Sequence, residues 1–310
     1  MSDILLRSAI LLAKKETTYG TSAAPTVGAN AILMSKPDIT PLDGTRVKHD
    51  YVRNFLGNSG GARVSSYAHM KFSVEAAGSG TAGTAPAYSA LLLACGTALT
   101  TVAITSCTYT PVSSGFDSVT LVFNIDGQNH QMTGARGTFQ LKFDAEALPY
   151  FEFDFTGLFS PLTYGVPGTA VLTAFKDAVG VNKANTTCAL HTRTMVARSL
   201  TLNAANSVKY RNLVGLEAVR IGDRQSTGDI EFLDDRVDQK DWVKAAQDGD
   251  KGALSWVHGT TAGNIITVAS PAAQLGGVSY GDIDGFRSVK SQLDLCSGAS
   301  GNDEWSIAFT

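Results

Sequence analysis

The chain has 310 residues, of which 44% are hydrophobic, 17% are charged and 31 are glycine. This length allows two domains or one elaborated domain, and the abundance of glycine, Thr, Ser and Val favours strands and turns over long helices. The formal net charge of −3 excludes a basic surface that would hold nucleic acid through its phosphates, so we expect a mainly β protein without tight DNA binding.

The first elements are an amino-terminal arm around residues 5–12 and a long turn-rich loop at about 43–67. A strand at 71–74 then precedes a short helical pattern over 84–96, in which Pro86 marks the start and the final glycine marks the end. We therefore expect a β-rich first half with one short helix.

Three alternating strands follow the helix. Apolar and polar residues alternate over 119–125, which runs into a tight Asp-Gly turn, and again over 139–143 and 151–155. Each strand therefore has one apolar and one polar face. Glu152 and Asp154 lie on the same polar face, where we expect a strand surface rather than a catalytic acid/base pair.

The second half repeats this order of elements. A strand at 230–233 precedes a helix with Trp242 turned inward, for which Asp238 is the expected N-cap and Gly249 the terminating residue. Alternating strands follow at 289–295 and 305–309.

The repeat predicts two tandem β-sandwich or barrel domains, each with a short flanking helix. Aligning 155–156 with 309–310 makes 305–309 the counterpart of 151–155. The expected boundaries are a first domain at 1–165, a linker at 166–194 and a second domain at 195–310. Identity between the halves is slight, and chance similarity between glycine-rich β sequences is the alternative.

Two glycine motifs could suggest an enzyme. Residues 78–83 form a G-x-G-x-x-G pattern after a strand, but the next acidic residue is Asp117, too distant for a ribose-binding carboxylate. Residues 57–61 match G-x-S-x-G around Ser59, but another β-like stretch follows instead of the helix that a nucleophile elbow requires. We interpret both as loops and expect no catalytic residue.

Histidines, cysteines and acidic clusters show no ligand pattern. The five histidines are isolated, the four cysteines lack C-x-x-C spacing, and the acidic run at 234–238 lacks the alternation of an EF-hand loop. We therefore expect no metal, no cofactor and a reducing compartment. No apolar stretch approaches the roughly 18 residues of a membrane-spanning helix, so no membrane partner is expected.

Several segments in combination resemble the major tail tube protein of long-tailed, siphovirus-like bacteriophages. They are the run TGARGTF at 133–139 with the strand after it, LP at 148–149, FEFDFTGL at 151–158, and the segments 12–21, 78–86 and 91–96. The second half shares the resemblance only through the repeat.

The resemblance implies a structural virion protein whose copies pool their strands into a ring around a channel, and whose rings stack into the tail tube. Six domains per ring is the family pattern, so a two-domain chain would form a trimeric, quasi-sixfold ring, with a hexamer as the alternative. The implied partners are the tape measure protein, tail terminator and distal tail proteins, and genomic DNA in transit. The implied locations are the host cytoplasm before assembly and then the virion tail.

Two sets of residues are candidates for assembly roles. The arm and the long loop are expected to make ring-to-ring contacts, and the polar face of the strand at 151–155 is a candidate lumen surface through Glu152 and Asp154. The expected ring-to-ring residues are Leu5, Leu6, Arg46, Lys48, Arg53, Phe55 and Leu56. The alternative function is an adhesive or carbohydrate-binding β-sandwich, which would need exposed aromatic platforms.

Overall fold

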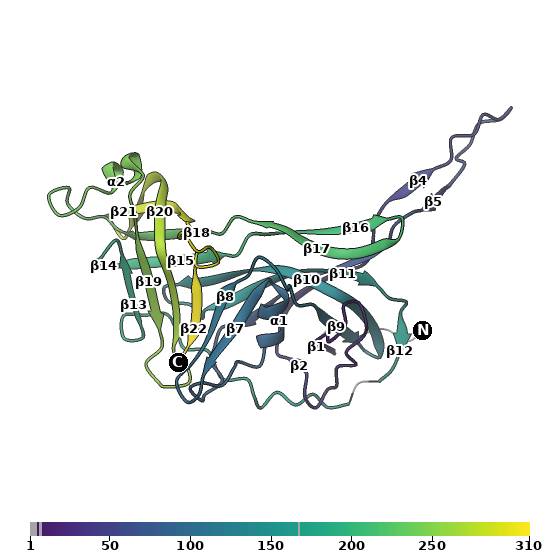
Figure 1. Cartoon of the computed structure of the whole chain (residues 1–310), viewed down its shortest axis with the longest axis horizontal. Coiled ribbons are helices and arrows are strands. Elements are labelled where there is room, and N and C mark those ends of the chain that lie inside the picture. Colours follow the sequence, from purple (N-terminus) through teal and green to yellow (C-terminus); the bar gives the residue numbers. More distant parts are fainter. Residues whose placement is uncertain (1–4, 6–7, 167) are drawn as a thin grey trace.

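The protein is described by a computed structural model that covers residues 5, 8–166 and 168–310. It is mainly β, as the alternating patterns predict (Figure 1). The elements up to the middle of the chain are β1 (Ala9–Lys15), β2 (Ala31–Ile32), β3 (Ser35–Asp43), β4 (Arg46–Lys48), β5 (Gly61–Arg63), β6 (Tyr67–Glu75), α1 (Ser89–Ala94), β7 (Thr97–Val102), β8 (Ser106–Pro111), β9 (Val119–Ile125), β10 (Gln128–Asp144), β11 (Tyr150–Phe159) and β12 (Thr163–Tyr164).

The elements of the second half follow in a similar order. They are β13 (Thr186–Leu190), β14 (Arg193–Met195), β15 (Ala197–Asn203), β16 (Asn206–Leu213), β17 (Leu216–Arg224), β18 (Thr227–Leu233), α2 (Trp242–Asp248), β19 (Lys251–His258), β20 (Ile266–Ile283), β21 (Phe286–Leu295) and β22 (Ser306–Phe309). No helix in the described ranges is long and apolar enough to span a membrane. The stretch expected as a linker, 166–194, contains β13 and most of β14, and β13 pairs with β19.

A single antiparallel sheet of eight strands runs through both halves, and we call it the long sheet. Its strand order is β3–β6–β11–β10–β15–β18–β21–β20. The halves meet inside it where β10 pairs with β15, with Leu141 opposite Leu202. The first and second halves are therefore joined by backbone hydrogen bonds as well as by packing.

A second layer of strands covers the apolar face of the long sheet. In this layer β2, β1 and β9 join the first part of β10, while β7, β8 and β22 join the first part of β20. The core between the layers is aromatic: Trp305 stacks edge-on against Phe139 with ring centroids 5.5 Å apart, and its Nε1 donates to Ser226 Oγ at 2.9 Å. Such aromatic pairs add to the burial that holds the layers together.

The long sheet contains the same four-strand unit twice. In each unit a strand, a hairpin, a strand and a short helix follow one another, so β3, β4–β5, β6 and α1 correspond to β15, β16–β17, β18 and α2. A one-residue bulge lies at the same place in both, before Asp38 in β3 and before Ser199 in β15. The two units therefore share one topology.

The predicted alignment of the last strand was wrong. The counterpart of β11 is β21, because β21 lies between β18 and β20 as β11 lies between β6 and β10. The final strand β22 instead pairs with β8 of the first half, with Ile307 opposite Tyr109. Alternation identifies a half-buried strand but not its neighbour, and this is why β22 was misplaced.

The helix boundaries also differ from expectation. α1 begins at Ser89, after a turn-rich segment that takes up the residues around Pro86. The N-cap of α2 is Asp241 rather than Asp238, since Asp241 Oδ1 accepts a hydrogen bond from the backbone N–H of Lys244 at 2.8 Å. Gly249 ends α2 in the left-handed conformation, as predicted.

Candidate assembly surfaces

The exposed face of the long sheet is polar across all eight strands. Most cross-strand partners on this face are polar, as where Gln140 lies opposite Asn203 and Asp229 lies opposite Gln292, and the exception is Ile283 opposite Phe286 at the end of β20. Its charged members include nine carboxylates (Asp38, Asp43, Glu75, Asp144, Glu152, Asp154, Asp229, Glu231 and Asp294) against five basic groups (Lys36, Lys71, Lys142, Arg198 and Lys290). The surface is therefore weakly acidic.

Glu152 and Asp154 lie together on this polar face. His69 Nε2 is 2.5 Å from Asp154 Oδ1, Lys71 Nζ is 3.2 Å from Asp154 Oδ2, and Lys142 Nζ is 2.6 Å from Glu152 Oε2. Burial raises the pKa of Asp154, but the hydrogen bonds and positive charges of His69 and Lys71 outweigh it and hold that pKa below its usual value. Asp154 is therefore a partly exposed, ionised member of a surface network.

The second half carries a matching acidic site. Glu231 lies 3.6 Å from Lys290 Nζ and 4.0 Å from Arg198 Nη1, and Ser288 Oγ donates to it at 2.9 Å. Among the described residues, Asp229 and Asp294 form no ion pair. Unneutralised carboxylates on an exposed face repel phosphate, so this surface is unsuited to holding DNA.

Both ends of the long sheet are open. Within the described ranges β3 pairs only with β6, and the part of β20 after Gln274 pairs only with β21. Arg287 O accepts from Asp234 N and Leu295 N donates to Ser226 O, so the odd residues of β21 face β18. In β20, Tyr280 and Asp282 are the cross-strand partners of Val289 and Arg287. Their backbone N–H and C=O groups therefore point away from β21, toward the open edge of the sheet.

Prolines mark the other end. Ala204 N donates to Phe139 O, so the backbone N–H and C=O groups of the even residues of β15 point toward β10. When β3 is aligned with β15 by their shared bulge, Pro41 takes one of these positions, and in β3 that position points toward the open edge. A proline is tolerated in a strand where its missing N–H would face away from the ladder. Pro37 and Pro41 are the sequence signal for an edge strand here, one that the alternation of apolar and polar residues does not contain.

A hairpin from the second half clasps the first half. β16–β17 packs against β10 and β11, and Arg136 reaches it from β10. The buried Arg136 guanidinium donates to the carbonyls of Asp117, Phe116 and Val219 at 3.2, 2.8 and 2.9 Å, and it stacks over the Tyr19 ring. Tyr19 Oη in turn accepts from Val219 N at 2.6 Å.

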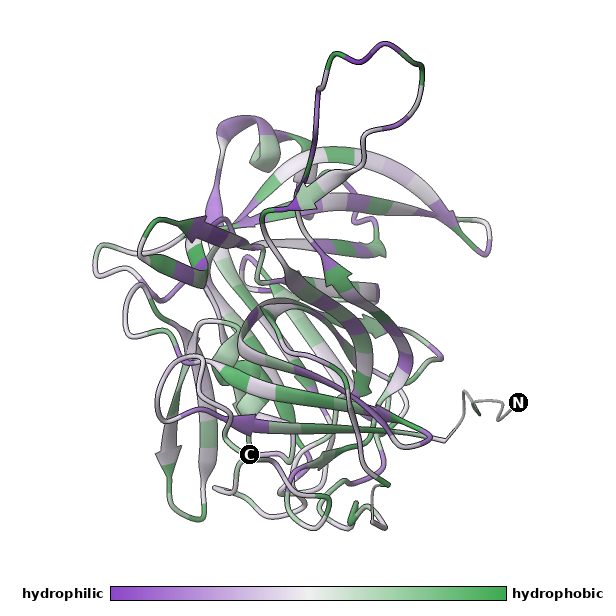
Figure 2. Cartoon of the chain, turned by 90° about the vertical axis from the view of Figure 1, so that its right-hand side faces the viewer, coloured by the Kyte–Doolittle hydropathy of each residue, from purple (hydrophilic) through white to green (hydrophobic). Residues whose placement is uncertain are grey.

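The long loop of the sequence is the β4–β5 hairpin, residues 43–66. It projects away from the body of the chain and carries hydrophobic and hydrophilic residues in alternation (Figure 2). Arg46, Lys48, Arg53, Phe55 and Leu56 all lie on it and are exposed. Leu5 is also exposed, whereas Leu6 lies outside the described residues. The structure places these residues at the surface and leaves their partners open.

The two glycine motifs have structural roles. Ser59 lies in the exposed β4–β5 hairpin, away from any helix. In the other motif Gly78 N donates to Asn264 Oδ1 at 2.7 Å, and a Cβ on Gly78 would lie 2.1 Å from Gly263 O. This glycine therefore allows a close backbone contact between the halves and is not part of a phosphate cradle.

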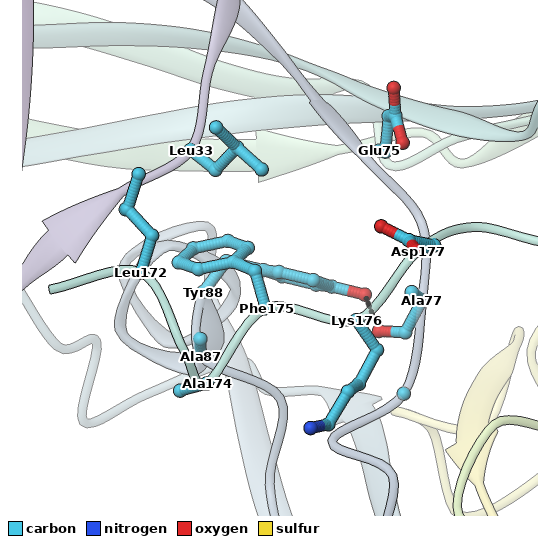
Figure 3. A pocket seen from close by; sticks show the side chains of 11 residues that line it. Leu33, Glu75, Ala77, Ala87, Tyr88, Leu172, Ala174, Phe175, Lys176 and Asp177 are labelled. Carbon is cyan, nitrogen blue, oxygen red and sulfur yellow. Dashed lines mark hydrogen bonds between the residues drawn. The ribbon is translucent and has the colours of Figure 1, made fainter.

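The pocket beside this loop has no arrangement that suggests catalysis. Phe175 and Tyr88 fill its floor, and Tyr88 Oη donates to Ala77 O at 2.7 Å (Figure 3). Lys176 extends to the side opposite Glu75 (Figure 3). No cluster of three potential metal ligands occurs in the described part of the chain. The pocket is where the segment 172–177 packs back onto the first half.

The three tryptophans are also structural. Trp242, Trp256 and Trp305 are at most 2% exposed. They cannot form the exposed aromatic platforms that an adhesive or carbohydrate-binding sandwich would use.

A β-sandwich with two open sheet ends is a fold that offers strand edges for pairing with another chain. The sequence matches the phage tail tube protein family over residues 7–283, so the chain belongs to that family. This membership makes it a structural component of the phage tail tube. No curated protein matches the sequence.

Proposed function

We propose that three copies of this chain form each ring of the tube. The observation that carries the proposal is the long sheet, which joins its two units through β10 and β15 but leaves β3 and β20 open. At the proposed interface between copies, β20 of one copy takes the place that β10 has at the internal junction, and β3 of the next copy takes the place that β15 has there. Repeating the internal junction three times closes the ring and removes every open end.

The width of the resulting barrel favours three copies over six. Eight strands from each of three copies give 24 strands. At about 4.8 Å between strands, their circumference is at least roughly 115 Å and their backbone diameter roughly 37 Å. Six copies would double both values. The smaller barrel suits a conduit that fits closely around one DNA duplex or one elongated protein.

The polar face of the long sheet would line the channel. Glu152 and Asp154 then face the lumen together with Asp229 and Asp294, and the weak excess of carboxylates keeps DNA from adhering to the wall. The channel would house the tape measure protein and later conduct DNA to the host cell. Terminator and distal tail proteins would cap the tube of a siphovirus-like tail, which assembles in the host cytoplasm.

Negative-stain microscopy of the purified full chain tests this proposal. Rings or hollow tubes are expected, with threefold modulation of a nearly sixfold outline after rotational averaging. A monomer at all concentrations, including with tail extract, would contradict it. Six chains per ring, counted by mass, would contradict the trimer while leaving tube formation intact.

A further inference from the structure

The β4–β5 hairpin has an intramolecular counterpart whose binding site is visible. β16–β17 arises between β15 and β18 and lies across the neighbouring unit, the one whose β10 pairs with β15. At its base Asn206 Nδ2 donates to Cys95 O, at the end of α1, and to Gly137 O in β10, at 2.6 and 3.1 Å. A hairpin at this place in the unit therefore clasps the adjacent unit.

The β4–β5 hairpin leaves its sheet at the corresponding residue. Asp43 Oδ1 accepts from the adjacent Gly44 N at 2.6 Å, and Asn203 Oδ1 accepts from Ala205 N, two residues further on, at 2.9 Å. Both donor residues have positive φ, +130° at Gly44 and +49° at Ala205. Both hairpins extend toward the same end of the molecule, one over the first half and the other into free space (Figure 1).

The hairpin surface is that of an unoccupied contact. It exposes six large apolar side chains (Val47, Tyr51, Val52, Phe55, Leu56 and Val64), of which Val52 and Leu56 are fully exposed. It carries four basic residues against two acidic ones over 43–66, whereas the segment around α2, 234–250, carries six acidic residues against three basic ones. The two segments are therefore complementary in charge.

We propose that the β4–β5 hairpin clasps the second half of the neighbouring copy in the same ring. Its site lies across the neighbour's β20 and β21, beside the carboxyl end of α2, and that neighbour is the one whose β20 pairs with β3. The proposal rests on the proposed ring, and it replaces the ring-to-ring role expected for the long loop. Each copy would then be held by a shared sheet edge and by a hairpin.

Photo-crosslinking in assembled protein tests the site. Tyr51 is replaced by p-benzoylphenylalanine in the full chain, and isotopically labelled and unlabelled copies are mixed so that adducts between chains can be recognised by mass spectrometry. The expected adducts join residue 51 to peptides within 234–295 of another copy. The same probe at Tyr164, which is 81% exposed and lies outside the hairpin, should not give these adducts.

The outcomes separate the two proposals. Rings with adducts from residue 51 to the second half of another copy support the clasp. Rings in which residue 51 gives no adduct, or reacts with the first half of another copy, overturn it and leave the ring intact. Failure to form rings is seen by microscopy before irradiation, and it overturns the ring and the clasp together.

Discussion

Replacing Tyr280 by proline should yield a folded monomer that no longer forms rings. The backbone N–H of Tyr280 points out of the open edge of β20, so its loss leaves the β20–β21 ladder intact. In the ring, the same change removes a hydrogen bond and places the proline ring against the incoming strand. The proline should weaken the binding free energy of each interface by about 3 kcal/mol, so the protein concentration needed for assembly rises by more than about 100-fold.

The matched control is Tyr280→Ala. It removes the aromatic ring, which packs over Arg287 in the chain, but it keeps the N–H. Sedimentation velocity and microscopy should show rings for the alanine variant and monomer for the proline variant, while circular dichroism and melting temperature show both to be folded. Rings at normal concentration with Tyr280→Pro would show that this edge is not the interface.

The largest effect on folding is expected from Arg136→Leu. The substitution leaves three carbonyl oxygens near the core without their donor and frees the β16–β17 hairpin, since Arg136 and Tyr19 hold it at Val219. The loss of these charged hydrogen bonds should cost about 3 kcal/mol, and for a chain of this length the melting temperature should fall by roughly 4–6 °C. Thermal unfolding of the full chain measures this fall.

A second readout and a control make the Arg136 prediction specific. Amide exchange of residues 206–224 should accelerate more than that of the long sheet, because the clasp is released first. Arg220→Ala, at an exposed position on the same hairpin, should change stability by less than about 0.5 kcal/mol. Equal effects of the two substitutions would show that Arg136 does not anchor the hairpin.

The sequence predicted the local structure better than the pairing. Alternating residues identified β9, β11 and the last part of β10 because one face of each is buried, and Asp126-Gly127 gave the hairpin between β9 and β10, but the first part of β10 was not predicted. The alternation of apolar and polar residues along a strand does not depend on which strand pairs with it. This is why β22 was assigned to the place that β21 occupies.

The assembly surfaces were only partly predictable. The shared face of Glu152 and Asp154 follows from the period of a strand, but the extension of that face over eight strands depends on the β10–β15 junction, which no local pattern encodes. Arg136 belongs to the segment that carries the family resemblance. Its partners come from residues about 20 and 83 positions away, so its anchoring role emerges only in the fold.

A disulfide between β3 and β20 would show whether these two edges meet between copies. When β3 is aligned with β15 by their shared bulge, Thr40 takes the position of Thr201. When β20 is aligned with β10 through their partners in β21 and β11, Ile283 takes the position of Lys142. Thr201 and Lys142 face each other at the internal junction as a pair without mutual hydrogen bonds, the kind whose side chains lie closest.

The experiment uses Thr40→Cys and Ile283→Cys together, with the half-exposed Cys296 replaced by serine, in assembled tubes under mild oxidation. Non-reducing electrophoresis should show covalent dimers and trimers and nothing larger, because three links close a ring. Each single cysteine variant should remain monomeric. A ladder extending to six chains, or no crosslinking in tubes that microscopy shows to be assembled, would contradict a three-copy ring closed between β3 and β20.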